Sequence, residues 1–109
     1  MLSREYRLPA TTKLFHAHYA KTEIFAVKYT TNNLPVSRFA FVVRKTVDKR
    51  AVVRNRIRRV FRSCIEEQLT QIVPGYDMLF FLEKGIINKQ QPELCEELQQ
   101  FLQQKHLIP

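Results

Sequence analysis

The sequence predicts a single α+β domain whose elements follow one another in the order αββαβα. Three observations indicate this fold class. The 109 residues are enough for one hydrophobic core but leave little room for two. Runs rich in β-branched and aromatic residues alternate with runs of helical periodicity. Only two glycines are present, and no repeat or linker interrupts the chain. We therefore treat residues 1–109 as one domain, a sandwich of a small mixed sheet with helices.

The first predicted element is a helix around residues 11–21, with Thr11 or Thr12 as its N-cap. Its apolar and aromatic residues have the spacing of one helical face: Leu14, Phe15, His18 and Tyr19. Two strands are predicted next, over residues 22–30 and 37–45, because both runs are rich in β-branched and aromatic side chains. The segment TNNLP between them is typical of a turn.

A long helix is predicted over residues 50–71. One side of it carries an apolar stripe: Ile57, Val60, Phe61, Cys64, Ile65, Gln68 and Ile72. The nearly continuous apolar run of residues 76–84 indicates a strand covered on both faces. Pro92 suits the first turn of a final helix. The apolar positions of that helix are Leu94, Leu98, Phe101 and Leu102.

The net charge of +8 is concentrated in one segment. Residues 44–62 carry nine basic and one acidic side chain, whereas residues 1–43 carry six and two, and residues 63–109 carry three and seven. The middle segment therefore accounts for the whole excess, because the charges of the two flanks cancel. Such a patch indicates a polyanionic partner.

The basic segment reverses the usual charge order of a helix. A helix N-terminus carries partial positive charge and favours acidic residues, yet Lys49 and Arg50 come first and Glu66 comes late. Arginine outnumbers lysine in this segment, and its planar side chain binds phosphate oxygens through two parallel hydrogen bonds. We interpret the helix as a polyanion-binding surface. A solvated helix face and a membrane-surface helix are the alternatives, and composition does not separate DNA from RNA.

Both cysteines, Cys64 and Cys95, lie on apolar helical stripes without metal-ligand spacing. We expect them to be reduced core residues, because free cysteine is among the most buried residue types. No apolar run approaches the roughly 20 residues of a membrane-spanning helix, and the charged N-terminal residues do not resemble a signal peptide. We therefore expect a cytoplasmic protein without membrane contact.

The segment AVVRNRIRRVFR, residues 51–62, resembles the signature of the bacterial ribonuclease P protein component. That signature is Arg-Asn, two residues, two basic residues, then Arg, on a helix that follows a strand. The order of the predicted elements is similar to the same family over nearly the whole chain. The resemblance implies a left-handed βαβ crossover, an exception to the right-handed rule, in a fold like the second domain of a ribosomal small-subunit protein.

The resemblance also implies a function. The chain would be the protein subunit of an RNA-catalysed endoribonuclease that removes the 5′ leader from precursor tRNA. Its partners would be a catalytic RNA and precursor tRNA, not DNA, and Mg²⁺ would be held mainly by the RNA. Carried over by position, the residues expected to contact the catalytic RNA are Arg44, Lys45, Lys49, Arg50, Arg54, Asn55, Arg58, Arg59 and Arg62.

An aromatic cleft for the leader is the second implied feature. Phe15 and Tyr19 would share one face of the predicted first helix. Tyr29 is the expected partner from the first strand, with Lys28 as the alternative if the register differs. Aromatic rings stack on unpaired bases of any sequence, which suits a leader of variable sequence. Packing in the core is the alternative role for these rings.

We find no catalytic constellation in the chain itself. The three histidines have no evident partners, and the carboxylates lack the paired spacing of a two-metal nuclease. We therefore expect the active site in the RNA. The rival interpretation is a ribosomal or RNA-chaperone type of binding module without a role in cleavage, which would share the basic helix but would not need an aromatic cleft.

Overall fold

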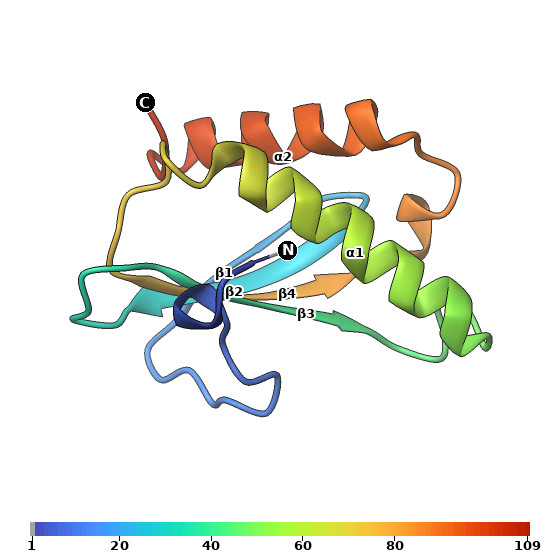
Figure 1. The fold of residues 1–109 in the computed structure, drawn as a ribbon, viewed down its shortest axis with the longest axis horizontal. Coiled ribbons are helices and arrows are strands. Elements are labelled where there is room, and N and C mark those ends of the chain that lie inside the picture. Colours follow the sequence, from blue (N-terminus) through green and yellow to red (C-terminus); the bar gives the residue numbers. More distant parts are fainter. Residues whose placement is uncertain (1) are drawn as a thin grey trace.

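A four-stranded mixed sheet in the order β1-β2-β4-β3 forms the base of the computed structural model, which describes residues 2–109. Helices α1 and α2 lie together on one face of this sheet (Figure 1). In chain order, the elements are η1 (Arg4–Tyr6), β1 (His18–Lys21), β2 (Phe25–Thr31), β3 (Arg38–Val43), α1 (Ala51–Gln68), β4 (Tyr76–Leu82), η2 (Lys84–Ile86) and α2 (Gln91–Gln104). The arrangement confirms the α+β class and the mixed sheet.

The predicted first helix around residues 11–21 is wrong, because the chain forms strand β1 there. β1 pairs antiparallel with β2, so that His18 lies opposite Tyr29 and Tyr19 lies opposite Lys28. A helix this short is marginal in water by itself, whereas the edge of the sheet satisfies the backbone groups of β1. Neighbouring side chains consequently point to opposite faces of the sheet.

The turn between β1 and β2 explains why β2 starts later than the strand predicted over residues 22–30. The hydroxyl of Thr22 accepts hydrogen bonds from the N–H groups of Ile24 and Phe25, each at 3.2 Å. These bonds close a tight turn within the first residues of the predicted strand, residues 22–30. The chain can extend along the sheet only after this turn.

The other predicted elements are confirmed with shorter bounds. β4 lies between β2, which is antiparallel to it, and β3, which is parallel to it. Met78 and Phe80 lie in the main core beneath the helices, whereas Leu79 and Phe81 belong to a smaller apolar cluster on the other face, so both faces of the strand carry apolar side chains. Pro92 lies in the first turn of α2, as predicted, and the N–H of Gln90 donates to Oε1 of Glu93 at 3.5 Å.

Phenylalanine rings dominate the packing between the sheet and the two helices. Phe61 of α1 and Phe101 of α2 meet Phe25 of β2 edge-on, with ring centroids 5.6 and 5.1 Å apart. Phe61 also contacts Phe41 of β3 and Phe80 of β4, at 5.7 and 5.2 Å. One ring of α1 thus touches three of the four strands, and this contact sets how the helix is rotated over the sheet.

The prediction of two reduced cysteines is also wrong. Cys64 of α1 and Cys95 of α2 form a disulfide, with their Cα atoms 4.8 Å apart. The pairing arises because α2 packs along α1, which brings two positions 31 residues apart in sequence next to each other. No local spacing in the sequence indicates such a contact.

The face of the sheet opposite the helices is covered only in part. Leu8 donates its N–H to the carbonyl of Phe39 at 2.8 Å beside β3, and the chain then runs beneath the sheet to β1 at the other edge (Figure 1). Leu8 and Leu14 pack there against Leu79 in a second, smaller apolar cluster. We call this side the open face.

A buried carboxylate ties β4 to β3 and to the turn before it. The guanidinium of Arg38 donates two hydrogen bonds to Asp77, at 2.9 and 2.8 Å, and Nδ2 of Asn32 donates a third at 2.8 Å. Burial acts to raise the pKa of Asp77, but the bonds from Arg38 and Asn32 outweigh it, so the pKa lies below its ordinary value. This stabilisation is present above the unfolded-state pKa of about 4 and is lost as pH falls through the lower folded pKa.

Asp77→Asn should lower the free energy of unfolding at pH 7 by about 2 kcal/mol, because it removes the charge that partners Arg38 while keeping the shape of the side chain. Denaturant unfolding at pH 7, 5 and 3 measures the effect. The difference between the two proteins should shrink below about pH 4, where the carboxylate takes up a proton. A difference that stays constant over this range would contradict the role given to the charge.

Candidate nucleic-acid interface

The carboxylate of Asp48 lies just before the N-terminus of the basic helix α1. Asp48 accepts hydrogen bonds from the guanidinium of Arg50 at 3.1 and 3.0 Å and from its backbone N–H at 2.9 Å. These bonds lower the pKa of Asp48 to about 2. Arg54 donates to the carbonyl oxygens of Asp48 and Lys49 at 3.0 and 2.8 Å. The entry to α1 is therefore ordered although its first turn contains no acidic residue.

Three arginines form a row along one side of α1: Arg54, Arg58 and Arg62, at i, i+4 and i+8. The guanidinium of Arg62 lies over the ring of Phe41 at 5.9 Å, so this side of the helix faces β3. Partial burial, followed by the charges of Arg54 and Arg62, lowers the pKa of Arg58. A bound anion would relieve the repulsion within this row, which we call the arginine row.

Other residues predicted to bind RNA surround the arginine row. Arg58 donates a hydrogen bond from its guanidinium to Oδ1 of Asn55, one turn earlier in the helix. Asn55 and Arg59 are exposed, as are Lys45 and Lys49 in the loop before α1. All the predicted residues thus lie on α1 or in the loop directly before it, and Arg44 differs from the others in its surroundings.

Arg44 lies apart from the others, because its guanidinium stands over the ring of Phe81 in β4 at 5.1 Å. Phe81 belongs to the smaller apolar cluster on the open face of the sheet. Arg44 therefore extends positive charge from the loop before α1 onto the open face.

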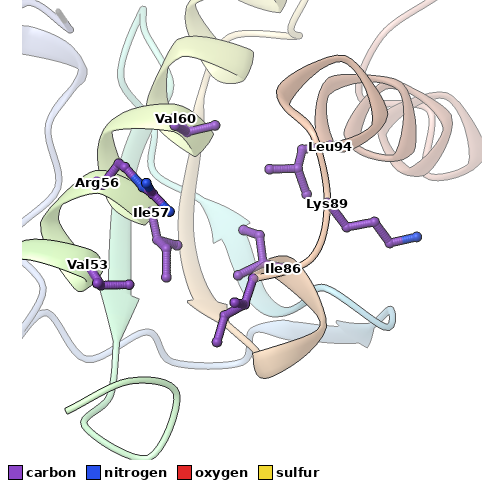
Figure 2. A pocket seen from close by; sticks show the side chains of 8 residues that line it. Val53, Arg56, Ile57, Val60, Ile86, Lys89 and Leu94 are labelled. Carbon is purple, nitrogen blue, oxygen red and sulfur yellow. The ribbon is translucent and has the colours of Figure 1, made fainter. Parts of the chain in front are cut away.

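Arg56 lies on the side of α1 that faces α2, beside a small pocket (Figure 2). The aliphatic residues around this pocket are Val53, Ile57, Val60, Ile86, Ile87 and Leu94. The pocket encloses about 60 Å³, far below the roughly 300 Å³ of ordinary ligand sites. Lys89 at its rim is paired with Glu97 at 3.2 Å. We interpret it as a packing gap between the helices.

Two exposed aromatic side chains mark the open face and its border. Phe15 is 75% exposed and Tyr19 is 61% exposed, more than a core role would allow. Tyr19 lies opposite Lys28 in the pairing of β1 with β2, so both side chains point to the same face. Phe15 precedes β1 in the segment that crosses beneath the sheet.

Tyr29 points to the other face of the sheet. Its ring lies 5.3 Å from His18 and 6.3 Å from Tyr76, and it packs against the main core beneath the helices. The structure therefore does not bring Tyr29 together with Phe15 and Tyr19. On the open face its place is taken by Lys28, which was the alternative left by the sequence.

Sequence reasoning missed Phe81 as a member of the open face. The apolar run of β4 predicts a strand covered on both faces, yet Phe81 is partly exposed while Phe80 is fully buried. Alternation within the strand was the available signal, because Leu79 and Phe81 share one face and Met78 and Phe80 share the other. The incomplete cover of the open face depends on the path of the N-terminal segment, which the sequence did not reveal.

Within residues 2–109, no group of three or more His, Cys, Asp or Glu side chains is arranged so that it could hold a metal ion. Over the same residues, no helix is both long enough and apolar enough to cross a membrane.

Comparison of the fold with solved structures finds bacterial RNase P proteins. The protein from Thermotoga maritima matches with a TM-score of 0.74 at 22% identity, covering 82% of this chain and 84% of that one. A structure of the protein from Staphylococcus aureus matches with a TM-score of 0.72 at 19% identity, covering 99% and 95% of the two chains. At these identities the likeness establishes the fold.

Sequence comparison identifies related proteins named ribonuclease P protein component. The relative from Microcystis aeruginosa is 36% identical over 72 residues, which are 66% of this chain and 60% of that protein. The relative from Roseiflexus castenholzii is 36% identical over 78 residues, which are 71% and 63% of the two chains. The matches to the first relatives thus span less than two thirds of their length. The family model for ribonuclease P matches residues 6–106, and the chain therefore belongs to the ribonuclease P protein family.

Proposed function

We propose that this protein is the protein subunit of a bacterial ribonuclease P and assists the removal of the 5′ leader from precursor tRNA. The observation that carries the proposal is the arginine row of α1, whose charges have no acidic partners on the helix between residues 49 and 62. Membership of the ribonuclease P protein family supports the catalytic RNA as the polyanion that this row would bind. In this proposal the assembly works in the bacterial cytoplasm, without DNA or a membrane as a partner.

The arginine row and the residues around it would bind the backbone of the catalytic RNA. Guanidinium groups spaced one helical turn apart can each take a phosphate oxygen pair. Asn55 contributes an amide that is already oriented by Arg58. Since RNA phosphates would replace the repulsion within the row by attraction, binding should be strongly dependent on salt.

The open face would bind the leader of precursor tRNA. Phe15 and Tyr19 offer exposed rings on which unpaired bases can stack. Lys28 adds positive charge opposite Tyr19, and Arg44 adds more over the ring of Phe81 on the same side. The two proposed surfaces lie on different sides of the molecule, which suits a protein that contacts two RNA molecules at once. Tyr29 lies on the face of the sheet that the helices cover, so a contact between Tyr29 and the leader is a separate prediction.

Catalysis is assigned to the RNA subunit, which would also hold most of the Mg²⁺. We assign no residue of this chain to a metal ion or to the cleavage step. The contribution of the protein would be to bind and orient two RNA molecules. A ribosomal or RNA-chaperone role is the alternative, and it differs because it requires neither discrimination of leaders nor a cleavage partner.

Replacing Arg58, Arg59 and Arg62 by Ala should weaken binding to the catalytic RNA and flatten its salt dependence. Each lost phosphate contact should reduce the slope of log K against log salt by about 0.7–0.9. Filter binding over a range of salt concentrations measures this slope. The matched control replaces Lys13, Lys84 and Lys105 by Ala, which removes the same charge outside α1. Equal slopes for both variants would contradict an interface centred on α1.

The protein freed of nucleic acid should not cleave precursor tRNA, whereas the protein with its cognate RNA and Mg²⁺ should cleave at the mature 5′ end. Gel analysis of labelled precursor tRNA measures both reactions. Accurate cleavage by RNA-free protein would place the active site in this chain. Efficient binding of the cognate RNA without any stimulation of cleavage would favour the chaperone alternative.

Phe15→Ala combined with Tyr19→Ala should weaken binding of precursor tRNA by the assembled enzyme at least about tenfold, since stacking contributes about 1–3 kcal/mol per base. Binding of mature tRNA and assembly with the RNA should barely change. Tyr29→Ala is the informative comparison, because its ring packs against the core and should affect thermal stability instead. If Tyr29→Ala alone reduced precursor affinity in a stable protein, the leader would follow the other face.

A further inference from the structure

The disulfide between α1 and α2 has two sulfurs of unequal access. Cys64 is fully buried in the main core. Cys95 is half-buried and lines a surface hollow of about 420 Å³ between the two helices. A dissolved molecule can therefore approach the disulfide only from the side of Cys95.

The hollow beside Cys95 carries acidic but no basic side chains among its lining residues. Glu67 comes from the end of α1 and Glu96 from the first half of α2, and the remaining polar residues are glutamines. A negatively charged molecule that enters is repelled, and a positively charged one is attracted. The hollow therefore favours positively charged molecules, and it gives access to Sγ of Cys95 and not to Sγ of Cys64.

We propose that Cys95 is a site of thiol–disulfide exchange with low-molecular-weight thiols, with Cys64 as the leaving sulfur. A thiolate attacks Sγ of Cys95, the Sγ–Sγ bond breaks, and Cys64 leaves as a thiolate that takes a proton from water. A second thiolate attacks the outer sulfur of the mixed disulfide and releases the Cys95 thiolate. The net reaction converts two small thiols and the protein disulfide into one small disulfide and two protein thiols.

The reverse reaction closes the disulfide again and uses a small-molecule disulfide as oxidant. It begins at Cys95, because only this thiolate can reach the oxidant, and Cys64 then attacks the mixed disulfide within the protein. Disulfides are rare in the bacterial cytoplasm because its thiols keep them reduced. If the protein works there, exchange at Cys95 sets the fraction of molecules in which α1 and α2 are joined.

Opening the disulfide should loosen the helix pair without separating it. The bond closes a long loop that contains β4 and η2, and it restricts the unfolded chain. Independently of this bond, α2 is held to the core by four buried side chains: Leu94, Leu98, Phe101 and Leu102. The reduced protein should therefore stay folded and lose thermal stability.

Single cysteine variants test which sulfur reacts. Cys64→Ala leaves Cys95 as a free thiol, and Cys95→Ala leaves Cys64. With oxidised glutathione under native conditions, Cys95 should form the mixed disulfide at least about tenfold faster than Cys64, because access limits the reaction. In guanidinium chloride the two rates should become similar. Equal native rates, or faster reaction of Cys64, would overturn the proposal.

The unaltered protein provides a second test that does not depend on how the variants fold. After partial reduction and acid quenching, peptide mass spectrometry should find the small thiol attached to Cys95 and not to Cys64. Cysteamine, which is cationic, should open the disulfide faster than anionic 2-mercaptoethanesulfonate at equal thiolate concentration, and added salt should reduce this difference. Adducts on Cys64, or air-oxidised protein with two free thiols, would refute the assignment.

Thermal unfolding of the same protein measures the consequence of exchange. Complete reduction should lower the midpoint by roughly 10 °C, given the usual contribution of a disulfide that closes a loop of this length. The circular dichroism spectrum at 20 °C should be nearly unchanged. An unchanged midpoint would contradict a stabilising role of the disulfide. Loss of helix on reduction at 20 °C would show that α2 does not stay packed on the core without it.

Discussion

The position of Phe61 between the sheet and the helices is the constraint on which the basic surface depends. Its ring contacts Phe25, Phe41 and Phe80, which belong to three different strands. Because these contacts admit only one rotation of α1, they decide which arginines face β3, which face α2 and which face solvent. A rotation by one residue would turn the arginine row away from β3 and bury charge elsewhere.

The parallel pairing of β3 and β4 makes that position of α1 necessary. Two parallel neighbours require a crossover, and the helix of this crossover must lie against the sheet. Its inner side is consequently apolar, and its polar residues are confined to the remaining circumference. The loop before α1 starts at the end of β3, where Arg44 turns to the open face. One crossover thus connects the basic surface with the aromatic one.

The electrostatics of α1 oppose its local stability. Partial burial, and after it the charges of Arg54 and Arg62, lowers the pKa of Arg58, and positive charge near a helix N-terminus is unfavourable. Asp48 offsets part of this cost, since it binds Arg50 and lies beside the N-terminus of the helix. Tertiary packing through Phe61 and Ile65 provides the rest, because both side chains belong to the main core.

Elements whose pattern is local can be predicted from the amino-acid sequence. Four such features can be read from a single segment of the sequence, because each depends on periodicity or on capping. They are the charge density on α1, the apolar stripe with Phe61, the apolar run of β4 and Pro92 at the start of α2. Tertiary structure alone decided that residues 18–21 form an edge strand, that Lys28 and not Tyr29 shares a face with Tyr19, and that Cys64 meets Cys95. These outcomes depend on backbone pairing and helix contacts between distant segments, and a short amphipathic run does not have enough local preference to resist them.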